Sequence, residues 1–343
     1  MEKITYLIGA GFSAPLGLPV MSNFLNMSKD LYSGDEELKW FGEVFQLIKE
    51  LSVAKNYYNT DLFNIEEIIS ILEMESFLGG RPLDKVFSSY IIETISRYTP
   101  GFAVSPVAAS NWYDHFFRGK GMNFLPFFMH IARARLSTVK EGREKTIADE
   151  DARYSIISLN YDMVVENYIN ALNSCEFVGE GVGLEKQKYD PGWSNIHLAK
   201  LHGSLDEGVI VPPTWAKGTH PSIVPVWSMA KEILRDSTQI RFIGYSLPLA
   251  DSYLKYLLKS SVLNSERLKS VDVICSDYNG SVRKRYEEFF NIPNFRFANC
   301  SFMELQEAFA SSFVPSGYVS FDIAVVTSKN SEATYEKFMR EHS

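Results

Sequence analysis

Two glycines near the N-terminus, Gly9 and Gly11, have the spacing of a nucleotide-binding turn. With Ala14 they complete the loose pattern Gly-x-Gly-x-x-Ala, which follows an apolar run over residues 4–8. In such a turn the first glycine permits the bend, the second lets the backbone approach a phosphate, and the small third residue keeps the helix against the strand. N–H groups at the helix start can then donate to the anion. The pattern predicts a site for a nucleotide diphosphate.

The elements that must position this turn are a buried strand over residues 4–8 and the helix after it. A nicotinamide dehydrogenase with this turn carries an acidic residue at the end of its second strand, about 20 residues on. The acidic residues near that distance, Asp30, Asp35 and Glu36, instead lie in a polar stretch. We therefore do not expect an ordinary dehydrogenase.

From Tyr154 onward, four further apolar runs are separated in part by helical stretches. This alternation predicts an α/β fold with a Rossmann-like, doubly wound, mostly parallel sheet covered on both faces. Such sheets bind ligands at the carboxyl ends of their strands. The segments expected at these ends are Gly9-Ala10-Gly11-Phe12-Ser13, Asn160-Tyr161-Asp162, His202-Gly203-Ser204, Gly244-Tyr245-Ser246 and Ser276-Asp277.

Together these segments resemble the sirtuin-like family, in the same order along the chain. The resemblance is carried by Gly9-Ala10-Gly11-Phe12-Ser13, Asn160-Tyr161-Asp162, Leu201-His202-Gly203-Ser204 and Phe242-Ile243-Gly244-Tyr245-Ser246-Leu247-Pro248. It extends from residue 4 to about 290, apart from a helical insertion, and is closest to the bacterial sirtuin-like domains of antiviral defence. Pro212-Pro213-Thr214-Trp215 and Val226-Trp227 are similar to that branch as well.

The chain departs from the protein-deacylating sirtuins in its cysteines. Those enzymes carry a four-cysteine zinc ribbon after the catalytic histidine, whereas no cysteine lies between His202 and Ile274. The resemblance therefore implies the branch that uses NAD as substrate, without zinc, and hydrolyses its nicotinamide–ribose bond. It also implies that a homo-oligomer, or a partner protein such as a sensor or an ATPase, controls this NAD depletion.

The chemistry of NAD cleavage gives roles to three residues in this resemblance. Nicotinamide leaves a cationic pyridinium as a neutral molecule, so no proton donor is needed, and the transition state resembles an oxocarbenium ion. We expect Asn160 to hold the attacking water or a ribose hydroxyl through its amide, and His202 to act as general base. Asp162 is expected to orient Asn160 or the ribose.

The remaining candidates for NAD binding lie in the turns at the strand ends. Gly244 lacks a side chain where a ligand approaches, and Ser246 can donate to a phosphate or ribose. Ser13 is either a first-turn residue or a ligand contact, and Asp277 either accepts from the adenosine ribose or serves in a turn. The full set is Gly9, Ala10, Gly11, Phe12, Ser13, Asp162, Gly244, Tyr245, Ser246 and Asp277.

Composition argues against several other classes of site. Cys175, Cys275 and Cys300 are widely separated, and His197 and His202 have no third ligand at a supporting spacing, so no metal site is expected. A formal net charge of -8 argues against direct binding of nucleic acid. Because no apolar run suits a signal peptide or a membrane span, we expect a cytoplasmic protein without membrane contact.

The pattern of apolar residues divides the chain into three parts. Residues 1–30 and 150–315 are expected to form the NAD-binding core. Residues 31–149 show helical periodicity and are interpreted as an insertion with a core of its own, in which Asn64 caps a helix. Residues 316–343 are expected to form a tail with a strand over Tyr318 to Thr327 and a helix over Glu332 to Glu341.

Two other functions would use the same site. A deacylase or ADP-ribosyltransferase would replace water by another nucleophile, and the missing zinc ribbon counts against it. A sensor would bind NAD or ADP-ribose without cleaving it, and the presence of both Asn160 and His202 counts against that alternative.

Overall fold

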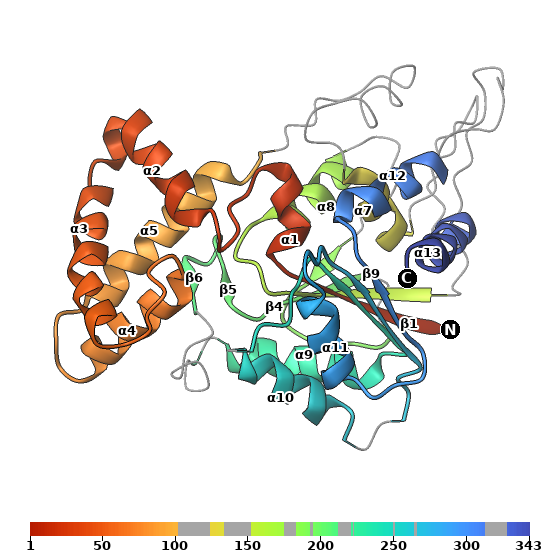
Figure 1. The fold of residues 1–343 in the computed structure, drawn as a ribbon. Coiled ribbons are helices and arrows are strands. Elements are labelled where there is room, and N and C mark those ends of the chain that lie inside the picture. Colours follow the sequence, from red (N-terminus) through yellow and green to blue (C-terminus); the bar gives the residue numbers. More distant parts are fainter. Residues whose placement is uncertain are drawn as a thin grey trace.

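The computed structural model describes residues 1–101, 124–133, 152–174, 183–192, 195–211, 221, 223–249, 251–263, 266–312 and 328–343. Its centre is a seven-stranded sheet in which every pairing is parallel, so the predicted Rossmann-like α/β fold is confirmed (Figure 1). The strands of this sheet are β1 (Glu2–Ile8), β2 (Ala152–Ser158), β3 (Leu184–Glu185), β4 (Ile196–Lys200), β7 (Gln239–Ile243), β8 (Ser270–Ile274) and β9 (Phe295–Ala298). No helix in these ranges is long and apolar enough to cross a membrane.

The strand order is β3-β4-β2-β1-β7-β8-β9, so successive strands are added first on one side of β1 and later on its other side. The topological switch point of the sheet therefore lies beside β1. After β1 the chain builds outward through β2 and β4, and it then returns to the other side of β1 for β7, β8 and β9. Ile8 is level with Ser158 and with Ile243, and Ser158 is level with Lys200. The residues that follow these strands therefore meet at one edge, at the point where such sheets bind ligands.

Helices cover both faces of the sheet (Figure 1). One face carries α9 (Val224–Asp236), α10 (Ser252–Ser261) and α11 (Ser281–Phe289). The other carries α7 (Leu125–Ile131), α8 (Val164–Ser174), α12 (Phe302–Ser312) and α13 (Ser328–His342). The expected closing helix is confirmed in α13, whereas the expected strand over Tyr318 to Thr327 lies outside the described residues.

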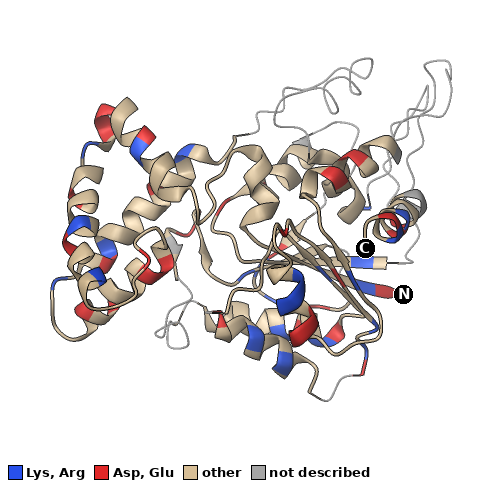
Figure 2. Cartoon of the chain, in the orientation of Figure 1, with Lys and Arg blue, Asp and Glu red and all other residues tan. Residues whose placement is uncertain are grey.

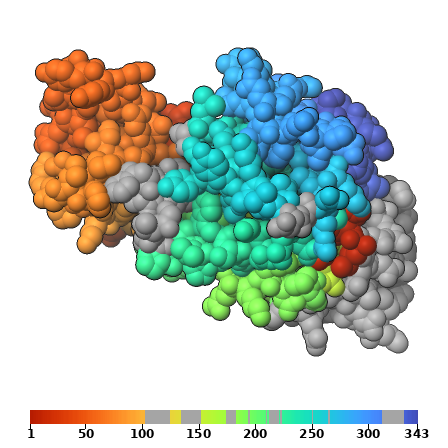
Figure 3. Space-filling view, turned by 90° about the horizontal axis from the view of Figure 1, so that it is seen from below, coloured from red at the N-terminus to blue at the C-terminus, as the bar shows by residue number. Residues whose placement is uncertain are grey.

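Four helices form a lobe beyond the strand ends (Figure 1), and this lobe projects from one side of the molecule in the space-filling view (Figure 3). They are α2 (Phe24–Gly34), α3 (Phe41–Leu51), α4 (Ile65–Phe77) and α5 (Leu83–Tyr98). The predicted cap of α4 is confirmed, because Asn64 Oδ1 accepts from the backbone N–H groups of Glu66 and Glu67 at 3.0 and 3.2 Å. Asn64 thereby satisfies two donors that the helix leaves unpaired.

The expectation that this insertion has a core of its own is wrong. Buried Phe41 and Tyr90 of the lobe belong to one apolar cluster with Tyr6 of β1. The same cluster contains an aromatic group around Phe12, whose ring lies 5.3 Å from that of Phe124 at the start of α7. Since α7 packs on α8 and α12, residues 125–131 lie in the layer over the sheet and not in the lobe.

Charged side chains of both signs are interspersed along the helices (Figure 2). Examples are the ion pairs of Arg97 with Glu93 on α5 and of Arg283 with Glu287 on α11. Helices with such alternating charges are typical of solvated surfaces, not of the single basic face by which proteins hold nucleic acid.

Candidate functional site

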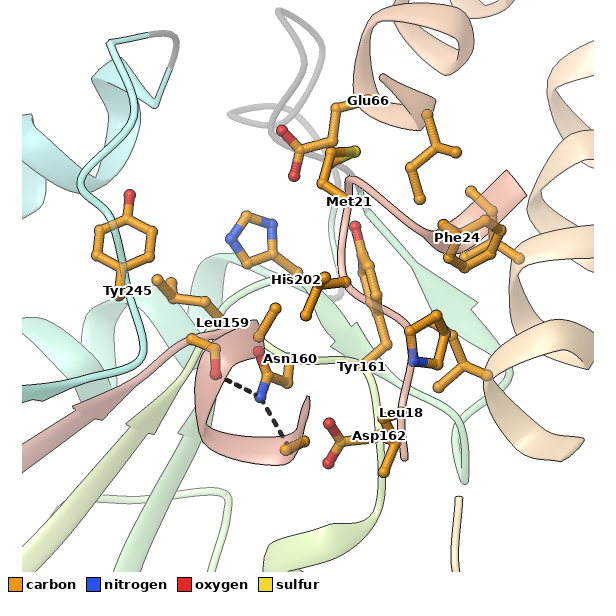
Figure 4. Close-up of a pocket in the computed structure, with 18 of the residues that line it drawn as sticks. Leu18, Met21, Phe24, Glu66, Leu159, Asn160, Tyr161, Asp162, His202 and Tyr245 are labelled. Atoms are coloured by element: carbon orange, nitrogen blue, oxygen red, sulfur yellow. Dashed lines mark hydrogen bonds between the residues drawn. The ribbon is translucent and has the colours of Figure 1, made fainter. Parts of the chain in front are cut away.

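A cavity of about 350 Å³ opens where the strand ends meet the helical lobe (Figure 4). This volume is near the lower end of the range of small-molecule sites, roughly 300–1,000 Å³. Predicted residues from four strands line it together, namely Gly9, Ala10, Ser13, Asn160, Asp162, His202, Gly244, Tyr245 and Ser246. The structure thus brings most of the predicted set into one site.

Asn160 is held in one orientation by both of its amide protons. Its Nδ2 donates to the carbonyl oxygen of Gly9 at 3.0 Å and to Ser13 Oγ at 3.2 Å. Figure 4 shows both bonds, with Oδ1 pointing away from them. Because Nδ2 is committed to the protein, the group that this amide offers to a ligand is an acceptor, Oδ1. The expectation that the amide holds water or a hydroxyl is thereby narrowed to one contact, a hydrogen bond that Oδ1 accepts from the ligand.

His202 follows β4 and begins a short hairpin of β5 (Gly203–Ser204) and β6 (Val209–Ile210). Its backbone carbonyl accepts from Val211 N at 2.8 Å, and its Nδ1 lies 3.3 Å from the carbonyl oxygen of Val211. A proton on Nδ1 satisfies that carbonyl and leaves the lone pair on Nε2, which is the tautomer a general base needs. The side chain lines the cavity although only 5% of the residue is exposed.

Asp162 combines a structural role with a place in the cavity. Its Oδ1 accepts from Val164 N at 3.0 Å, at the start of α8. Burial raises the pKa of the Asp162 carboxyl above its ordinary value, while the Lys200 ammonium, the Val164 N–H and the Ser13 hydroxyl act in the opposite direction. Since Ser13 also accepts from Asn160, this serine connects Asp162 with Asn160.

The glycines of the first turn are required by backbone packing. A Cβ on Gly11 would lie 2.8 Å from Gly244 Cα, and a Cβ on Gly9 would lie 2.8 Å from Gly244 O. Gly244 has a φ of +62°, and a Cβ there would lie 2.2 Å from Phe12 N. The close approach of these two turns therefore explains all three glycines without a ligand.

The N–H groups of the first turn donate to protein carbonyls, which corrects the expected phosphate cradle. Gly9 N donates to Ile243 O at 3.0 Å, Gly11 N to Gly244 O at 2.9 Å and Phe12 N to Gly9 O at 2.9 Å. The helix that follows, α1 (Ala10–Ser13), has only four residues. These three donors are not free to bind an anion in this geometry.

Three predicted residues lie outside the cavity lining: Gly11, Phe12 and Asp277. Phe12 is fully buried against Phe302, with ring centroids 4.5 Å apart. Asp277 Oδ2 accepts from Arg283 N at 2.9 Å at the start of α11, so the turn role of Asp277 is the one observed. Burial alone would raise the pKa of Asp277, but backbone N–H donors hold it below its ordinary value.

The turn after β7 is fixed by side chains from both neighbouring segments. Tyr245 donates to Asp251 Oδ2 at 2.7 Å, and Asp251 Oδ1 caps α10 by accepting from Leu254 N. Arg285 Nε donates to Ser246 O at 3.0 Å. Leu247 has a φ of +47°, a conformation that a non-glycine residue adopts only when its surroundings enforce it. The wall formed by Tyr245 and Ser246 is therefore rigidly placed.

The helical lobe supplies a wall that the sequence did not reveal. Apolar side chains from α2, α4, α5 and residues 18–21, which precede α2, line this side, and the Glu66 carboxylate points into the cavity (Figure 4). The apolar face of α4 was visible in the spacing of its isoleucines, but the spacing does not say what the face covers. The apolar residues of this wall are Leu18, Pro19, Val20, Met21, Phe24, Ile65, Ile69, Ile91 and Ile95.

The charged residues that line the cavity are acidic. Glu66, Asp162 and Asp251 are present, and no Lys or Arg belongs to the described lining. The described residues also contain no cluster of His, Cys, Asp and Glu suited to a metal ion. The lining favours a ligand that is polar at the strand ends, apolar on the lobe side, and positively charged or rich in hydroxyl groups.

No protein-family model and no curated protein matches the chain.

Proposed function

We propose that the chain is an NAD glycohydrolase of the sirtuin-like family, which transfers ADP-ribose from nicotinamide to water. The observation that carries the proposal is the presence of Asn160 and His202 in one cavity at the topological switch point of the sheet. Sheets of this order bind nucleotides there. NAD would contact the strand-end residues of the cavity, with Ser13, Asp162 and Ser246 as its polar side chains.

The proposed reaction divides the work between the two residues. Asn160 Oδ1 accepts a hydrogen bond from the attacking water or a ribose hydroxyl, and His202 Nε2 takes the proton that water loses. The water oxygen bonds to C1 of the ribose while the bond between C1 and the nicotinamide nitrogen breaks. The electron pair of the broken bond stays with nicotinamide, which leaves as a neutral molecule. NAD and water thus give nicotinamide, ADP-ribose and one proton.

The charge of the cavity supports the cleavage step of this proposal. The transition state of such a displacement carries positive charge on the sugar ring. Preorganised negative groups near that ring stabilise the developing charge. Glu66 and Asp162 face the same cavity as Asn160, and no described lysine or arginine lines it to oppose them.

We also propose that assembly or an activating partner controls this hydrolase, as in the defence proteins that the motifs resemble. Exposed aromatic residues on the helical lobe support such a contact: Tyr57, Tyr58 and Phe77 are 78%, 73% and 69% exposed. Aromatic side chains are enriched at protein contacts relative to the rest of the surface. Activity that rises with the mass of the assembled protein or on addition of cell extract would support this control. Equal activity per chain at every concentration, with and without extract, would contradict it.

The direct test is nicotinamide release from NAD, followed by chromatography at high protein concentration with and without cell extract. Loss of a general base lowers turnover by about 10²–10⁴-fold, so we expect this from His202→Ala and a similar loss from Asn160→Ala. His197→Gln is the matched control, because His197 lies on β4, the strand that His202 follows, but accepts from Asp190 N outside the cavity. Equal release by wild type and both cavity variants would overturn the proposal.

A further inference from the structure

Lys200 is a buried lysine at the end of β4, two residues before His202, and only 7% of it is exposed. Its Nζ donates to the backbone carbonyl oxygens of Tyr161 and Asp162 at 3.2 and 2.5 Å. These carbonyls belong to the loop that carries Asn160. A lysine is rarely buried to this degree unless its ammonium is fully paired.

The same ammonium reaches the segment on the other side of His202. Nζ donates to Ser204 Oγ at 2.8 Å and approaches Glu166 Oε1 of α8 at 3.3 Å. Lys200 therefore joins the loop after β2 to the hairpin after β4. These are the two segments that supply Asn160 and His202.

Neutralisation of Glu166 does not account for this arrangement. Lys186 already pairs with Glu166 Oε1 at 3.0 Å, which is closer than Lys200. Lys186 also pairs with Asp206 and is considerably more exposed than Lys200. The contacts that belong to Lys200 and not to Lys186 are those with the two loop carbonyls and with Ser204.

We propose that Lys200 is a positioning residue, which fixes the Asn160 loop relative to His202 through the Tyr161 and Asp162 carbonyls. The inference rests on the proposed NAD hydrolysis. Asn160 and His202 come from neighbouring strands, so their separation depends on what holds the two following segments together. A displacement of about 1 Å between reacting groups can cost about 100-fold in rate, which makes a rigid connection between these segments valuable.

The experiment compares Lys200→Met with Lys186→Met, which removes the other cation from Glu166 and leaves the loop carbonyls paired. We expect kcat for nicotinamide release to fall about 100-fold in Lys200→Met with KM within about threefold, because the displaced groups act in the transition state. Lys186→Met should retain kcat within about twofold, because the Lys200 contacts with the two loop carbonyls and with Ser204 remain in place. Hydrogen exchange of the amides of residues 159–164, measured without NAD, should accelerate in Lys200→Met and not in Lys186→Met.

The two readouts separate failure of this inference from failure of the proposed function. If wild type releases nicotinamide and Lys200→Met keeps its kcat, Lys200 has no positioning role. If wild type releases none under any condition, the hydrolase proposal fails, and exchange at residues 159–164 alone decides whether Lys200 anchors the loop. Should Lys200→Met not fold, Ser204→Ala removes a single acceptor of Nζ, and a kcat equal to that of wild type would overturn the inference.

Discussion

Asn160 on the loop after β2 donates from Nδ2 to the carbonyl oxygen of Gly9, 3.0 Å away at the end of β1. The bond joins two adjacent strand ends and leaves Oδ1 facing the cavity. An asparagine in this place thus serves the fold and the site with different atoms. The proposed role of Asn160 in the site depends on this division between Nδ2, which bonds to the protein, and Oδ1, which faces the cavity.

Replacement of Asn160 by aspartate tests the division. Asn160→Asp removes the donor and places a carboxylate oxygen against Gly9 O, so we expect a loss of about 1–3 kcal/mol in the free energy of unfolding. Nicotinamide release should fall about 100-fold or more, because the displaced side chain no longer presents its acceptor to water. Urea unfolding and chromatography measure the two effects.

The control for this variant is Asn167→Asp on α8. Asn167 Nδ2 donates to the carbonyl oxygen of Pro100 at 3.0 Å, which is the same type of bond outside the cavity. We expect a comparable loss of stability with turnover within about twofold of wild type, as for a bond remote from the reacting groups. Equal losses of turnover in both variants would show that Asn160 acts through stability alone.

Gly244 and Gly208 have the same φ of +62° but different surroundings, and they offer a test of the turn packing. In Gly208→Ala the added methyl group has open space around it, so the only penalty is that of the left-handed backbone conformation, roughly 1–2 kcal/mol in the free energy of unfolding. In Gly244→Ala the methyl group also meets Phe12 N at 2.2 Å. We expect Gly244→Ala to lose at least about 2 kcal/mol more than Gly208→Ala, since overpacking typically costs 1–3 kcal/mol. Equal melting temperatures of the two variants would contradict this packing.

Arg241 of β7 and Glu332 of α13 form a bidentate pair, with both N–O distances at 2.9 Å. The guanidinium is fully buried and stacks on Tyr335, 3.6 Å from the ring centroid. Glu332→Leu would leave this charge with only the more distant Glu336 carboxylate, 3.9 Å away, so we expect a loss of about 3–5 kcal/mol. The double variant Arg241→Met/Glu332→Leu should be more stable than Glu332→Leu alone. If the double variant lost as much free energy of unfolding as the two single variants together, energetic coupling between Arg241 and Glu332 would be excluded.

His130 of α7 should make stability depend on pH. Burial lowers the pKa of His130 to about 4, so the native protein keeps this imidazole neutral below pH 6.5, where the unfolded chain binds a proton. Stability is therefore lost as pH falls from about 6.5 to 4. We expect His130→Gln to weaken this pH dependence, while loss of the bonds to Tyr6 and Ser331 lowers its stability at pH 7. If the free energy of unfolding changed equally with pH in wild type and in His130→Gln between pH 5 and 6.5, the lowered pKa of His130 would be contradicted.

The sequence was informative wherever one local signal decides the structure. The strand ends were predictable because each apolar run stops at a polar or glycine-containing turn, and register then brings Asn160 and His202 to one edge. The cap formed by Asn64 follows from a side chain that bonds to nearby backbone, which requires no knowledge of the rest of the fold.

The parts that could not be predicted depend on contacts between distant segments. The glycine pattern alone predicts a phosphate site. In the structure Gly11 packs against Gly244, 233 positions later in the chain, so closely that neither position has room for a side chain. Burial of Phe12 under α12 and the wall formed by α4 likewise depend on packing that spacing does not encode. Lys200 gave no signal, because a single lysine at the end of a strand is ordinarily solvated.

Hydrolysis in H₂¹⁸O tests the central claim most directly, with wild type and His202→Ala incubated with NAD under activating conditions. The account predicts that wild type releases nicotinamide together with ADP-ribose that carries one ¹⁸O at the ribose C1, and that His202→Ala loses this product. Nicotinamide release with ADP-ribose attached to protein or to an acyl group would show transfer in place of hydrolysis. Binding of NAD without any nicotinamide release would contradict the account.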